Sequence, residues 1–398
     1  MYEGRHPILF AKDKPPFKPD NRIVANFAKY IVDVLNGYFI GKPVKTLHKN
    51  LETAEKIHDI EKYNDQDDNN SEISKMCSIY GNAFELLYVN EESKICMTYF
   101  SPMEAFIVYD DSVARKPLYG VRYYCDKDKV MYGSVYSRDT EYFFTNSGGG
   151  LRFLNNKRAH NFNGVPLIEY IENEERTGAF EHVSSLITAY SKALSEKAND
   201  VDYFGDSYLK ILGSKLDEET LITLRDNRII NLESFSGDKV EVEFMQKPDA
   251  DATQEHFLDR LEKEIFSLSM VANISDEEFG NATGNALAYK LLAMDNLCRM
   301  KERKFVSGMN RRWKLIFSHI LSNLHPDDYI DITYQFTRNA PHNLLEEVET
   351  AAKMAGISSR KTQLKVISAI DNVEAELDEI SKENGTIPKD ELRAERSF

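Results

Sequence analysis

The most informative segment of the sequence is NISDEEFGNATGNALAYKLLAMDNL, residues 273–297. Its first half is small, polar and acidic, whereas its second half repeats apolar residues at helical spacing. We therefore expect one helix to end just before this stretch and a long helix, about 286–323, to begin inside it. Ser275 and Glu278 fit a capping box, so part of this joint has a purely structural explanation.

The composition is that of a folded, multidomain protein. The chain has 398 residues, enough for two or three domains. Hydrophobic residues make up 42% and charged residues 29%, and the 21 Tyr and 22 Phe argue against widespread disorder. The net charge of −15 argues against tight wrapping of DNA, because affinity for phosphates comes from Lys and Arg.

Cysteine usage and hydropathy indicate the compartment. Cys77, Cys96, Cys125 and Cys298 form no Cys-x-x-Cys pair, which favours a reducing compartment and argues against a zinc site. The first residues contain no apolar core of signal-peptide length, and no run approaches the ~20 apolar residues of a membrane span. We expect a protein that is made and kept in the cytoplasm, with no membrane partner.

Helices and sheet alternate along the chain. Helical spacing predicts a first helix that ends at Asn36-Gly37, and further helices at about 48–64, 71–80, 180–204, 256–272, 343–355, 358–368 and 371–383. Between 82 and 172, short runs rich in Tyr, Phe and Val, separated by turn residues every 8–12 positions, predict antiparallel sheet with hairpins.

An acidic insert separates two of these helices. Residues 205–255 hold the alternating strand KVEVEF, and 14 acidic against 6 basic residues lie between Asp200 and Glu255. The long helix is the opposite, with eight basic and two acidic residues from 286 to 323. Two helices that flank an insert suggest a helical hairpin with a separate small domain at its tip. Ser307-Gly308 is the point at which the long helix can kink.

Motifs for catalysis or cofactor binding are weak. GYFIGKP, residues 37–43, has too few residues between its glycines for a phosphate loop, and Pro43 removes an amide. Asp65, Asp67 and Asn69 resemble the start of a calcium loop, but Met76 stands where the bidentate Glu belongs, so a solvated capping loop is the simpler interpretation. No nucleophile elbow or metal-binding histidine pair is present, so we expect no enzyme, no cofactor and no metal.

Three segments resemble a known family. They are NRIVANFAKYIVDVLNGYFIGKPV near the start, GVPLIEYIEN after the sheet and, most specifically, ISDEEFGNATGNALAYKLLAMDNLCRMKERKF. Together with the order of elements, they are similar to the portal proteins of tailed bacteriophages, of the type found in siphophages of Gram-positive hosts. The resemblance covers most of residues 20–385.

The resemblance implies an α+β portal fold with a helical wing plus antiparallel sheet, a two-helix stem, a small α/β clip, a long tunnel-proximal helix and a helical crown. Matched by order, the parts are an N-terminal arm at 1–20, the wing at 21–180, stem helices at 181–204 and 256–272, the clip at 205–255, the tunnel loop at 273–285, the long wing helix with a returning strand at 286–340, and the crown and tail at 341–398.

The resemblance also implies function and partners. Portals are homo-oligomeric rings, of twelve subunits in the virion, at one capsid vertex. Double-stranded DNA passes through the channel without sequence specificity during packaging and ejection. Terminase, head–tail connector (adaptor) proteins, and the major capsid and scaffold proteins are the protein partners. The resemblance further implies that the protein is assembled in the host cytoplasm and is finally located in the virion.

The tunnel loop and the clip are the candidate sites. Acidic loop residues would repel phosphates, the glycines would let the loop shift, and the other polar residues could offer transient hydrogen bonds. The tunnel-loop set is Asp276, Glu277, Glu278, Gly280, Asn281, Thr283, Gly284 and Asn285. The clip docking set is Asp217, Glu218, Glu219, Glu241 and Glu243, and KVEVEF could pair with a strand of a neighbouring subunit.

Two other classes remain open at this point. A non-ring minor head or scaffold-interacting structural protein predicts monomers or dimers without a central hole. A DNA-processing enzyme predicts turnover of ATP or cleavage of DNA, and the missing phosphate loop argues against it.

Overall fold

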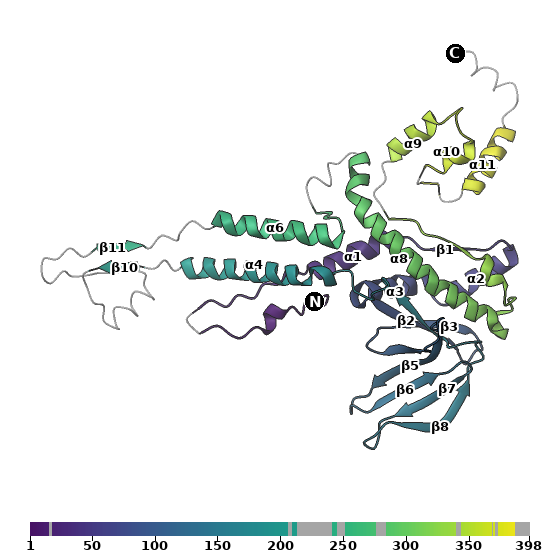
Figure 1. Cartoon of the computed structure of the whole chain (residues 1–398). Coiled ribbons are helices and arrows are strands. Elements are labelled where there is room, and N and C mark those ends of the chain that lie inside the picture. The colour runs from purple at the N-terminus through teal and green to yellow at the C-terminus, as the bar shows by residue number, and fades with distance from the viewer. Residues whose placement is uncertain are drawn as a thin grey trace, which may run out of the picture.

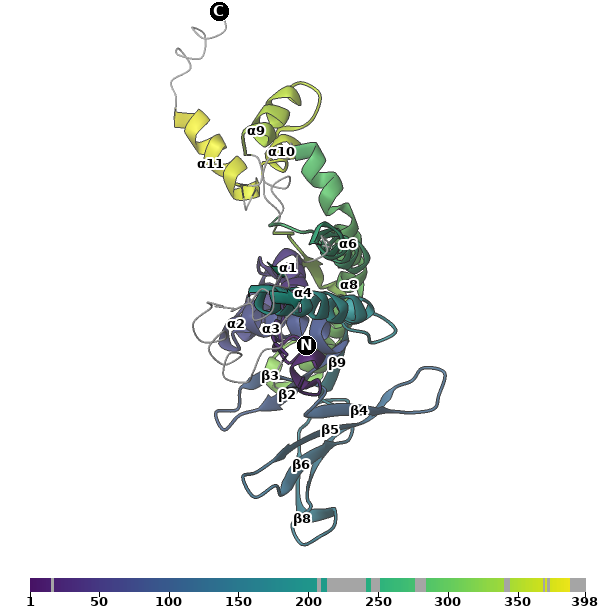
Figure 2. The ribbon, with the colours of Figure 1, turned by 90° about the vertical axis from the view of Figure 1, so that its left-hand side faces the viewer.

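The computed structural model describes residues 1–15, 18–205, 209–212, 241–244, 251–275, 284–339, 344–367, 369–370 and 373–386. It is a mixed α+β structure with antiparallel sheets, as expected. Figure 1 shows a body of helices and sheets, a pair of long helices that projects to the left of it, and a group of short helices above it. Seen along the projecting pair, the molecule is elongated, with the sheet at one end and the short helices towards the other (Figure 2).

Four helices and a small sheet form the helical part of the body. The helices are α1 (Phe27–Ile40), α2 (Leu51–Tyr63), α3 (Gln66–Tyr80) and α8 (Gly284–Ser318). Asn50 caps α2 by accepting from two backbone amides, and Gly81 ends α3 with φ +87°, a backbone angle that favours glycine. β1 (Lys45–Leu47) pairs antiparallel with β12 (Thr333–Gln335), which joins chain segments far apart in sequence.

Two antiparallel sheets pack beneath these helices. The first has the order β3-β2-β9, with β2 (Asn82–Val89), β3 (Ile95–Phe100) and β9 (Leu167–Ile171). The second runs in sequence order through β4 (Ala105–Tyr109), β5 (Pro117–Cys125), β6 (Met131–Tyr136), β7 (Thr140–Thr145) and β8 (Arg152–Ala159). The hairpin prediction for 82–172 is therefore confirmed.

Strand β2 is covered on both faces. Ala83 and Leu87 belong to the main core, which includes buried residues of α1, α3 and α8, whereas Phe84 and Leu86 belong to a second core against the five-stranded sheet. This double burial explains why AFELLYV reads as an apolar run rather than as an alternation.

The projecting pair consists of α4 (Ser184–Gly205) and α6 (Asp251–Ser269), which lie side by side and run in opposite directions (Figure 1). Lys197 pairs with Glu255, and Gln254 donates to Asp200 (3.1 Å), across the pair. Beyond its far end, β10 (Leu209–Leu212) pairs antiparallel with β11 (Glu241–Phe244).

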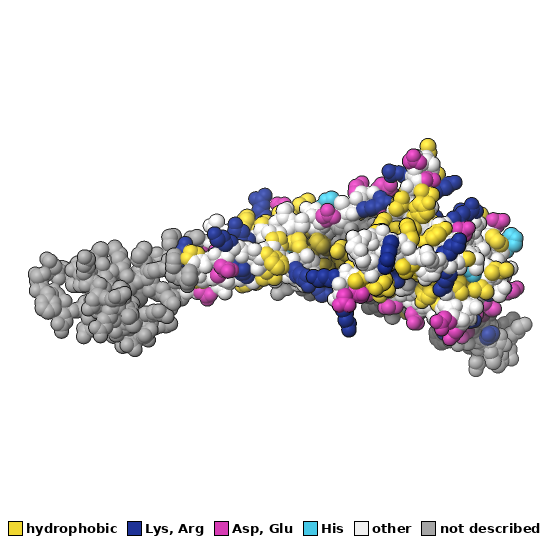
Figure 3. All heavy atoms as spheres, turned by 90° about the horizontal axis from the view of Figure 1, so that it is seen from below, with side chains coloured by type: hydrophobic (Ala, Val, Ile, Leu, Met, Phe, Trp, Pro, Cys, Tyr) yellow, Lys and Arg dark blue, Asp and Glu magenta, His cyan; other side chains and the backbone are white. Residues whose placement is uncertain are grey.

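The C-terminal group contains α9 (Leu344–Lys353), α10 (Arg360–Leu364) and α11 (Val373–Thr386), close to the three short helices that the sequence predicts. The 3-10 turns are η1 (Pro7–Phe10), η2 (Glu181–Val183), η3 (Ile320–Ser322) and η4 (Asp328–Asp331). Seen from below, hydrophobic side chains cover the body in patches that charged side chains interrupt (Figure 3).

Several expected helix boundaries are wrong, among them the start of α6, which is Asp251 rather than 256. The first helix does not end at Asn36-Gly37 but continues to Ile40, because Phe39 is fully buried and stacks on Phe336. Burial of such a side chain outweighs the cost of about 1 kcal/mol for a glycine inside a helix. The long helix stops at Ser318 rather than near 323, and His319 caps the 3-10 turn that follows.

The polar segment 64–70 is also not the capping loop expected from its sequence. α3 begins at Gln66, so Asp67, Asn69 and Asn70 lie on a helix, and the calcium-loop alternative fails. The side chain of Asn70 is buried and accepts from Gln66 Nε2 (3.0 Å) and Arg312 Nη2 (2.7 Å). Hydrogen bonds that include long-range ones therefore hold Gln66 and Asn70 in the core.

Candidate functional site

The long helix α8 is held in the body by two buried ion pairs. Lys301 Nζ lies 2.7 Å from Glu172 Oε2, and Arg312 Nε lies 2.8 Å from Glu85 Oε2, with all four side chains at most 4% exposed. Lys301 and Arg312 lie eleven residues apart on α8, about 16 Å along the helix axis. Two separated contacts of this kind fix both the rotation and the axial position of α8.

Each pair has further hydrogen bonds that offset the loss of hydration. Glu85 also accepts from Tyr170 Oη (2.9 Å) and from Gln66 Nε2 (3.1 Å). Lys301 also donates to the Ser74 carbonyl (3.0 Å) and to Ser78 Oγ (2.5 Å). Burial, the largest single effect, lowers the pKa of Arg312, but Glu85 together with Tyr170 and Glu61 outweighs it, and the pKa is raised.

Close backbone packing accompanies these pairs. A Cβ on Gly308 would lie 2.4 Å from the Tyr170 ring, so glycine lets α8 approach β9. Ser307 and Gly308, the point at which the sequence suggested a kink, lie inside α8, which continues as a helix on both sides of them. Cys298 is buried in the same helix, and burial raises its thiol pKa to about 12, which makes the thiol unreactive at neutral pH.

The joint between α6 and α8 is anchored on its α6 side. The Ile274 amide donates to Tyr30 Oη (2.8 Å), and Asn273 Nδ2 donates to Glu262 Oε1 (3.3 Å). The Ser275 amide donates to Asn273 Oδ1 (3.2 Å), which starts a turn. The chain therefore leaves α6 in a defined direction and re-enters the described structure at Gly284.

Most of the predicted tunnel-loop residues lie outside the described part of the chain. They are Asp276, Glu277, Glu278, Gly280, Asn281 and Thr283. Gly284 and Asn285 form the first turn of α8. Asp217, Glu218 and Glu219 of the clip set also lie outside the described residues, whereas Glu241 and Glu243 lie on β11. β11 pairs with β10 of the same chain, so one of its edges is already occupied.

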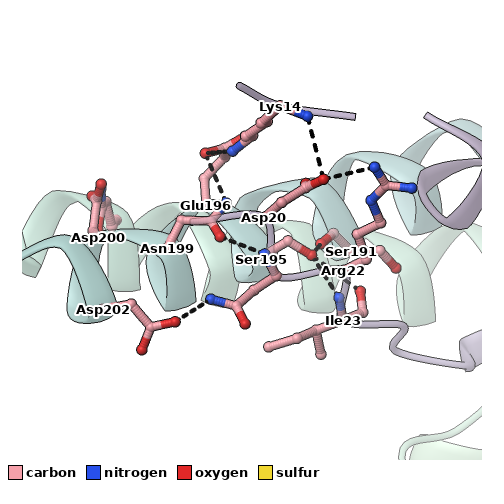
Figure 4. Close-up of polar contacts among 12 residues, drawn as sticks. Lys14, Asp20, Arg22, Ile23, Ser191, Ser195, Glu196, Asn199, Asp200 and Asp202 are labelled. Carbon is pink, nitrogen blue, oxygen red and sulfur yellow. Dashed lines mark hydrogen bonds and ion pairs between the residues drawn. The ribbon is translucent and has the colours of Figure 1, made fainter. Parts of the chain in front are cut away.

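An N-terminal arm runs along α4 in a way that the sequence did not reveal in detail. The extended segment 21–25, which continues the arm of residues 1–20, donates three alternate backbone amides to side chains spaced four residues apart on α4 (Figure 4): Asn21 N to Asn199 Oδ1 (2.6 Å), Ile23 N to Ser195 Oγ (2.8 Å) and Ala25 N to Ser191 Oγ (3.4 Å). Two residues of extended chain and four residues of helix both span roughly 6–7 Å, which explains this match.

Charged contacts complete the arm. Lys14 Nζ lies 2.9 Å from Glu196 Oε2, and Asn21 Nδ2 donates to Asp202 Oδ2 at 2.5 Å. Within the arm, Arg22 pairs with Asp20 at 2.7 Å (Figure 4). The arm and α4 therefore form one packed unit, in which the arm lies on the helix of its own subunit.

Two properties bear on other functions. Among the described residues, no group of three or more His, Cys, Asp or Glu side chains is arranged to hold a metal ion. In the same part of the chain, no helix combines the length and the apolar character that crossing a membrane requires.

The comparisons with known proteins identify the family. Residues 1–389 match the phage portal protein family of the SPP1 Gp6-like type. The chain is 26% identical over 394 residues to the portal protein of Bacillus phage SPP1, and the match covers 92% of this chain and 76% of that protein. It is 25% identical over 393 residues to the portal protein of Clostridium phage phiCD119, and this match covers 92% of this chain and 86% of that protein.

The family match agrees with the resemblance drawn from residues 273–297 and the two shorter segments, and it favours the portal interpretation over a minor head protein or a DNA-processing enzyme. Portal proteins are structural, non-enzymatic components of the virion that form oligomeric rings in contact with DNA and other head components. The chain belongs to the SPP1 Gp6-like family of phage portal proteins and acts as a phage portal.

Proposed function

We propose that twelve copies of the chain surround a channel at one capsid vertex, and that each copy directs residues 273–285 towards the passing duplex. The observation that carries this proposal is the position of the joint. It connects the projecting pair to the first turn of α8, a helix that two buried ion pairs fix in the body. A loop on such a support can move while its base stays in place.

The same proposal divides the subunit into parts by their order along the chain. The stem is the α4–α6 pair, expected at 181–204 and 256–272; because α6 begins at Asp251, residues 251–255 join the stem, and the clip is the rest of the insert 205–255, beyond the far end of the pair (Figure 1). Residues 21–180 with 286–340 form the wing, residues 341–398 form the crown and tail, and residues 1–20 form an arm. The wing is the region that contacts the capsid and scaffold proteins.

The acidic residues of the loop keep DNA from adhering to the channel. Asp276, Glu277 and Glu278 would be repeated around the ring, and like charges close to phosphates repel within a Debye length of about 8 Å at physiological salt. Reversal of these charges adds cationic phosphate contacts, whose binding strength falls as salt rises.

The loop is tested with the double variant Asp276→Lys, Glu277→Lys. We expect rings that retain duplex DNA in a salt-dependent way, and a lower yield of packaged particles. A matched control is Glu91→Lys with Asp128→Lys, because both side chains are exposed on turns of the sheet region. Unchanged DNA retention and packaging in the loop variant would contradict the proposed role of the loop.

The acidic clip would dock the packaging terminase first and the head–tail connectors afterwards. Glu241 and Glu243 on β11 and Asp217, Glu218 and Glu219 supply the charge. The variant Glu241→Lys, Glu243→Lys should weaken terminase binding by rings, measured by pull-down at two salt concentrations. Retention of wild-type binding, also after deletion of 205–255, would exclude the clip as the docking site.

The ring itself is tested first and independently. Light scattering gives the mass of the assembled protein, and negative-stain images show whether a central hole is present. A protein that remains monomeric or dimeric under all assembly conditions would overturn the proposed ring, whatever the loop and clip variants do.

A further inference from the structure

An open pocket with a volume of about 1190 Å³ lies between the β4–β5 hairpin, β9 and the middle of α8. Its charged lining holds five cations and four carboxylates; the carboxylates are Asp110, Asp111, Glu169 and Glu174, of which Asp110 accepts from Ser112 Oγ and from the Lys116 amide within the hairpin. Arg115 and Lys116 lie on the hairpin, Glu169 on β9, and Lys304 and Arg311 on α8. The size of this space suits several side chains of a protein partner.

Two of the cations in the pocket have carboxylate partners within the chain. Arg176 Nε lies 2.7 Å from Glu169 Oε1, and Lys304 pairs with Glu174. Glu169 also accepts from Tyr109 Oη (2.5 Å). The carboxylates Glu169 and Glu174 are therefore already engaged, and the charge at this end of the pocket is balanced.

Arg311 differs from these cations. Its Nη2 donates to the Val165 carbonyl (3.3 Å), and its Nε is buried without an acceptor among the described residues. No carboxylate of the described residues lies within ion-pair distance of its guanidinium. Burial lowers the pKa of Arg311, and the Coulombic effect of Tyr109 opposes this shift without cancelling it.

A partly buried guanidinium without a counter-charge is unfavourable in an isolated subunit, because its hydration is lost without compensation. Such a group becomes favourable when a carboxylate approaches through the open side of the pocket, since a guanidinium binds a carboxylate in a two-pronged geometry. The pocket therefore fits an acidic partner.

An acidic surface of the right kind lies on the opposite side of the same subunit. Asp65, Asp67 and Asp68, at the start of α3, are exposed, and none of them forms an ion pair with a described residue. In Figure 2, α2 and α3 lie on the left of the body, whereas α8, β9 and β4 lie on the right. A closed ring joins unlike faces of neighbouring subunits, so these two sides can meet around the ring.

We propose that the Arg311 pocket of one subunit receives the acidic start of α3 from the next subunit, with Asp67 and Asp68 as partners of the guanidinium. This inference rests on the proposed ring, because only a ring places a second copy against both sides. It assigns to the pocket a role in the order and spacing of subunits, which neither the fold nor the family match specifies.

The test is charge reversal with rescue. Arg311→Glu should raise the protein concentration needed for half-maximal ring formation by roughly tenfold or more, because loss of a desolvated ion pair weakens each interface. Asp67→Arg with Asp68→Arg should have a similar effect. The combined variant, with charges exchanged between the two sides, should regain most of the assembly. Lys127→Glu, on an exposed turn of the outer sheet, is the matched control.

Light scattering measures assembly, and circular dichroism confirms that each variant is folded. If Arg311→Glu is folded and assembles like the wild type, or if the exchanged variant is not rescued although each partner alone is impaired, the proposal is overturned. If assembly is unchanged but retention of DNA falls, the occupant is nucleic acid and the proposal is again overturned.

Cross-linking separates failure of this inference from failure of the ring. With Cys125 replaced by Ser, we expect the pair Ala114→Cys and Asp68→Cys to form disulfides between subunits, visible as a ladder of covalent oligomers. Rings without a ladder would refute this contact and leave the proposed function intact. Absence of rings in the wild type would refute the proposed function itself.

Discussion

The Arg312–Glu85 pair allows a quantitative test of how the body holds α8. The Glu85 carboxylate accepts from three donors, of which Arg312 Nε (2.8 Å) carries a full charge, and both side chains of the pair are at most 1% exposed. Glu85→Leu removes the acceptor and leaves the guanidinium with Asn70 Oδ1 (2.7 Å) as its remaining partner.

We expect Glu85→Leu to lower the free energy of unfolding by about 3–5 kcal/mol, the usual cost of removing one partner of a buried ion pair. This is a large share of a total stability of roughly 5–15 kcal/mol. The double variant Glu85→Leu, Arg312→Met removes the unpaired charge as well. It should recover at least about 2 kcal/mol relative to Glu85→Leu, because apolar replacements of a buried pair are often well tolerated.

The assay is urea unfolding followed by tryptophan fluorescence. Trp313 is the single tryptophan of the chain, is fully buried, and adjoins Arg312 in sequence, so its emission reports on this region. Light scattering ensures that all variants are compared in the same assembly state, because assembly adds to apparent stability. Glu91→Ala, on an exposed turn, is the control and should change stability by less than about 0.5 kcal/mol.

The reasoning is refuted if Glu85→Leu unfolds within about 1 kcal/mol of the wild type. It is also refuted if the effects of Glu85→Leu and Arg312→Met simply add in the double variant, because additivity would mean that the two groups do not interact.

Three further predictions concern the body. His160 and His319 each accept a backbone amide at Nδ1 (3.2 Å), and burial lowers both pKa values, so protonation is disfavoured in the folded state. The free energy of unfolding should therefore fall as pH drops below the unfolded pKa of about 6.5, by at most about 1.4 kcal/mol per pH unit for each histidine. Urea unfolding at several pH values measures this dependence, and the free energy of unfolding of His319→Asn should change less steeply with pH. Gly308→Ala should cost about 1–3 kcal/mol, because the new Cβ overlaps the Tyr170 ring, and a thermal midpoint equal to that of Ser307→Ala would contradict the close packing. A thiol reagent should label Cys125 rapidly in the native protein and all four cysteines only after denaturation, as measured by absorbance; fast labelling of a second thiol would show that the cores open readily.

The sequence by itself determined the order and type of most elements. Periodicity placed α2, α4 and the C-terminal helices within a few residues, and aromatic runs with regular turns placed the hairpins. These features depend on which residues alternate locally, and local alternation is sufficient to choose between helix and strand. The segment 273–297 was specific enough to identify the family before the fold was known.

Local sequence patterns did not predict which polar residues are buried in the core. The segment 64–70 reads as a loop, yet Gln66 and Asn70 are buried because Glu85 and Arg312, from distant parts of the chain, supply their hydrogen-bond partners. The arm along α4 is a similar case, since its hydrogen bonds join residues more than 160 positions apart.

Arg311 and Arg312 show the limit most clearly. They are neighbours in sequence and identical in chemistry, but α8 turns by about 100° between them. Arg312 therefore points into the core, where Glu85, 227 residues away in sequence, neutralises it, whereas Arg311 lines an open pocket without a carboxylate partner among the described residues. A basic helix could be predicted from the sequence, but which of its charges have partners depends on the folded chain, because the partners of a buried charge come from distant segments that folding brings together.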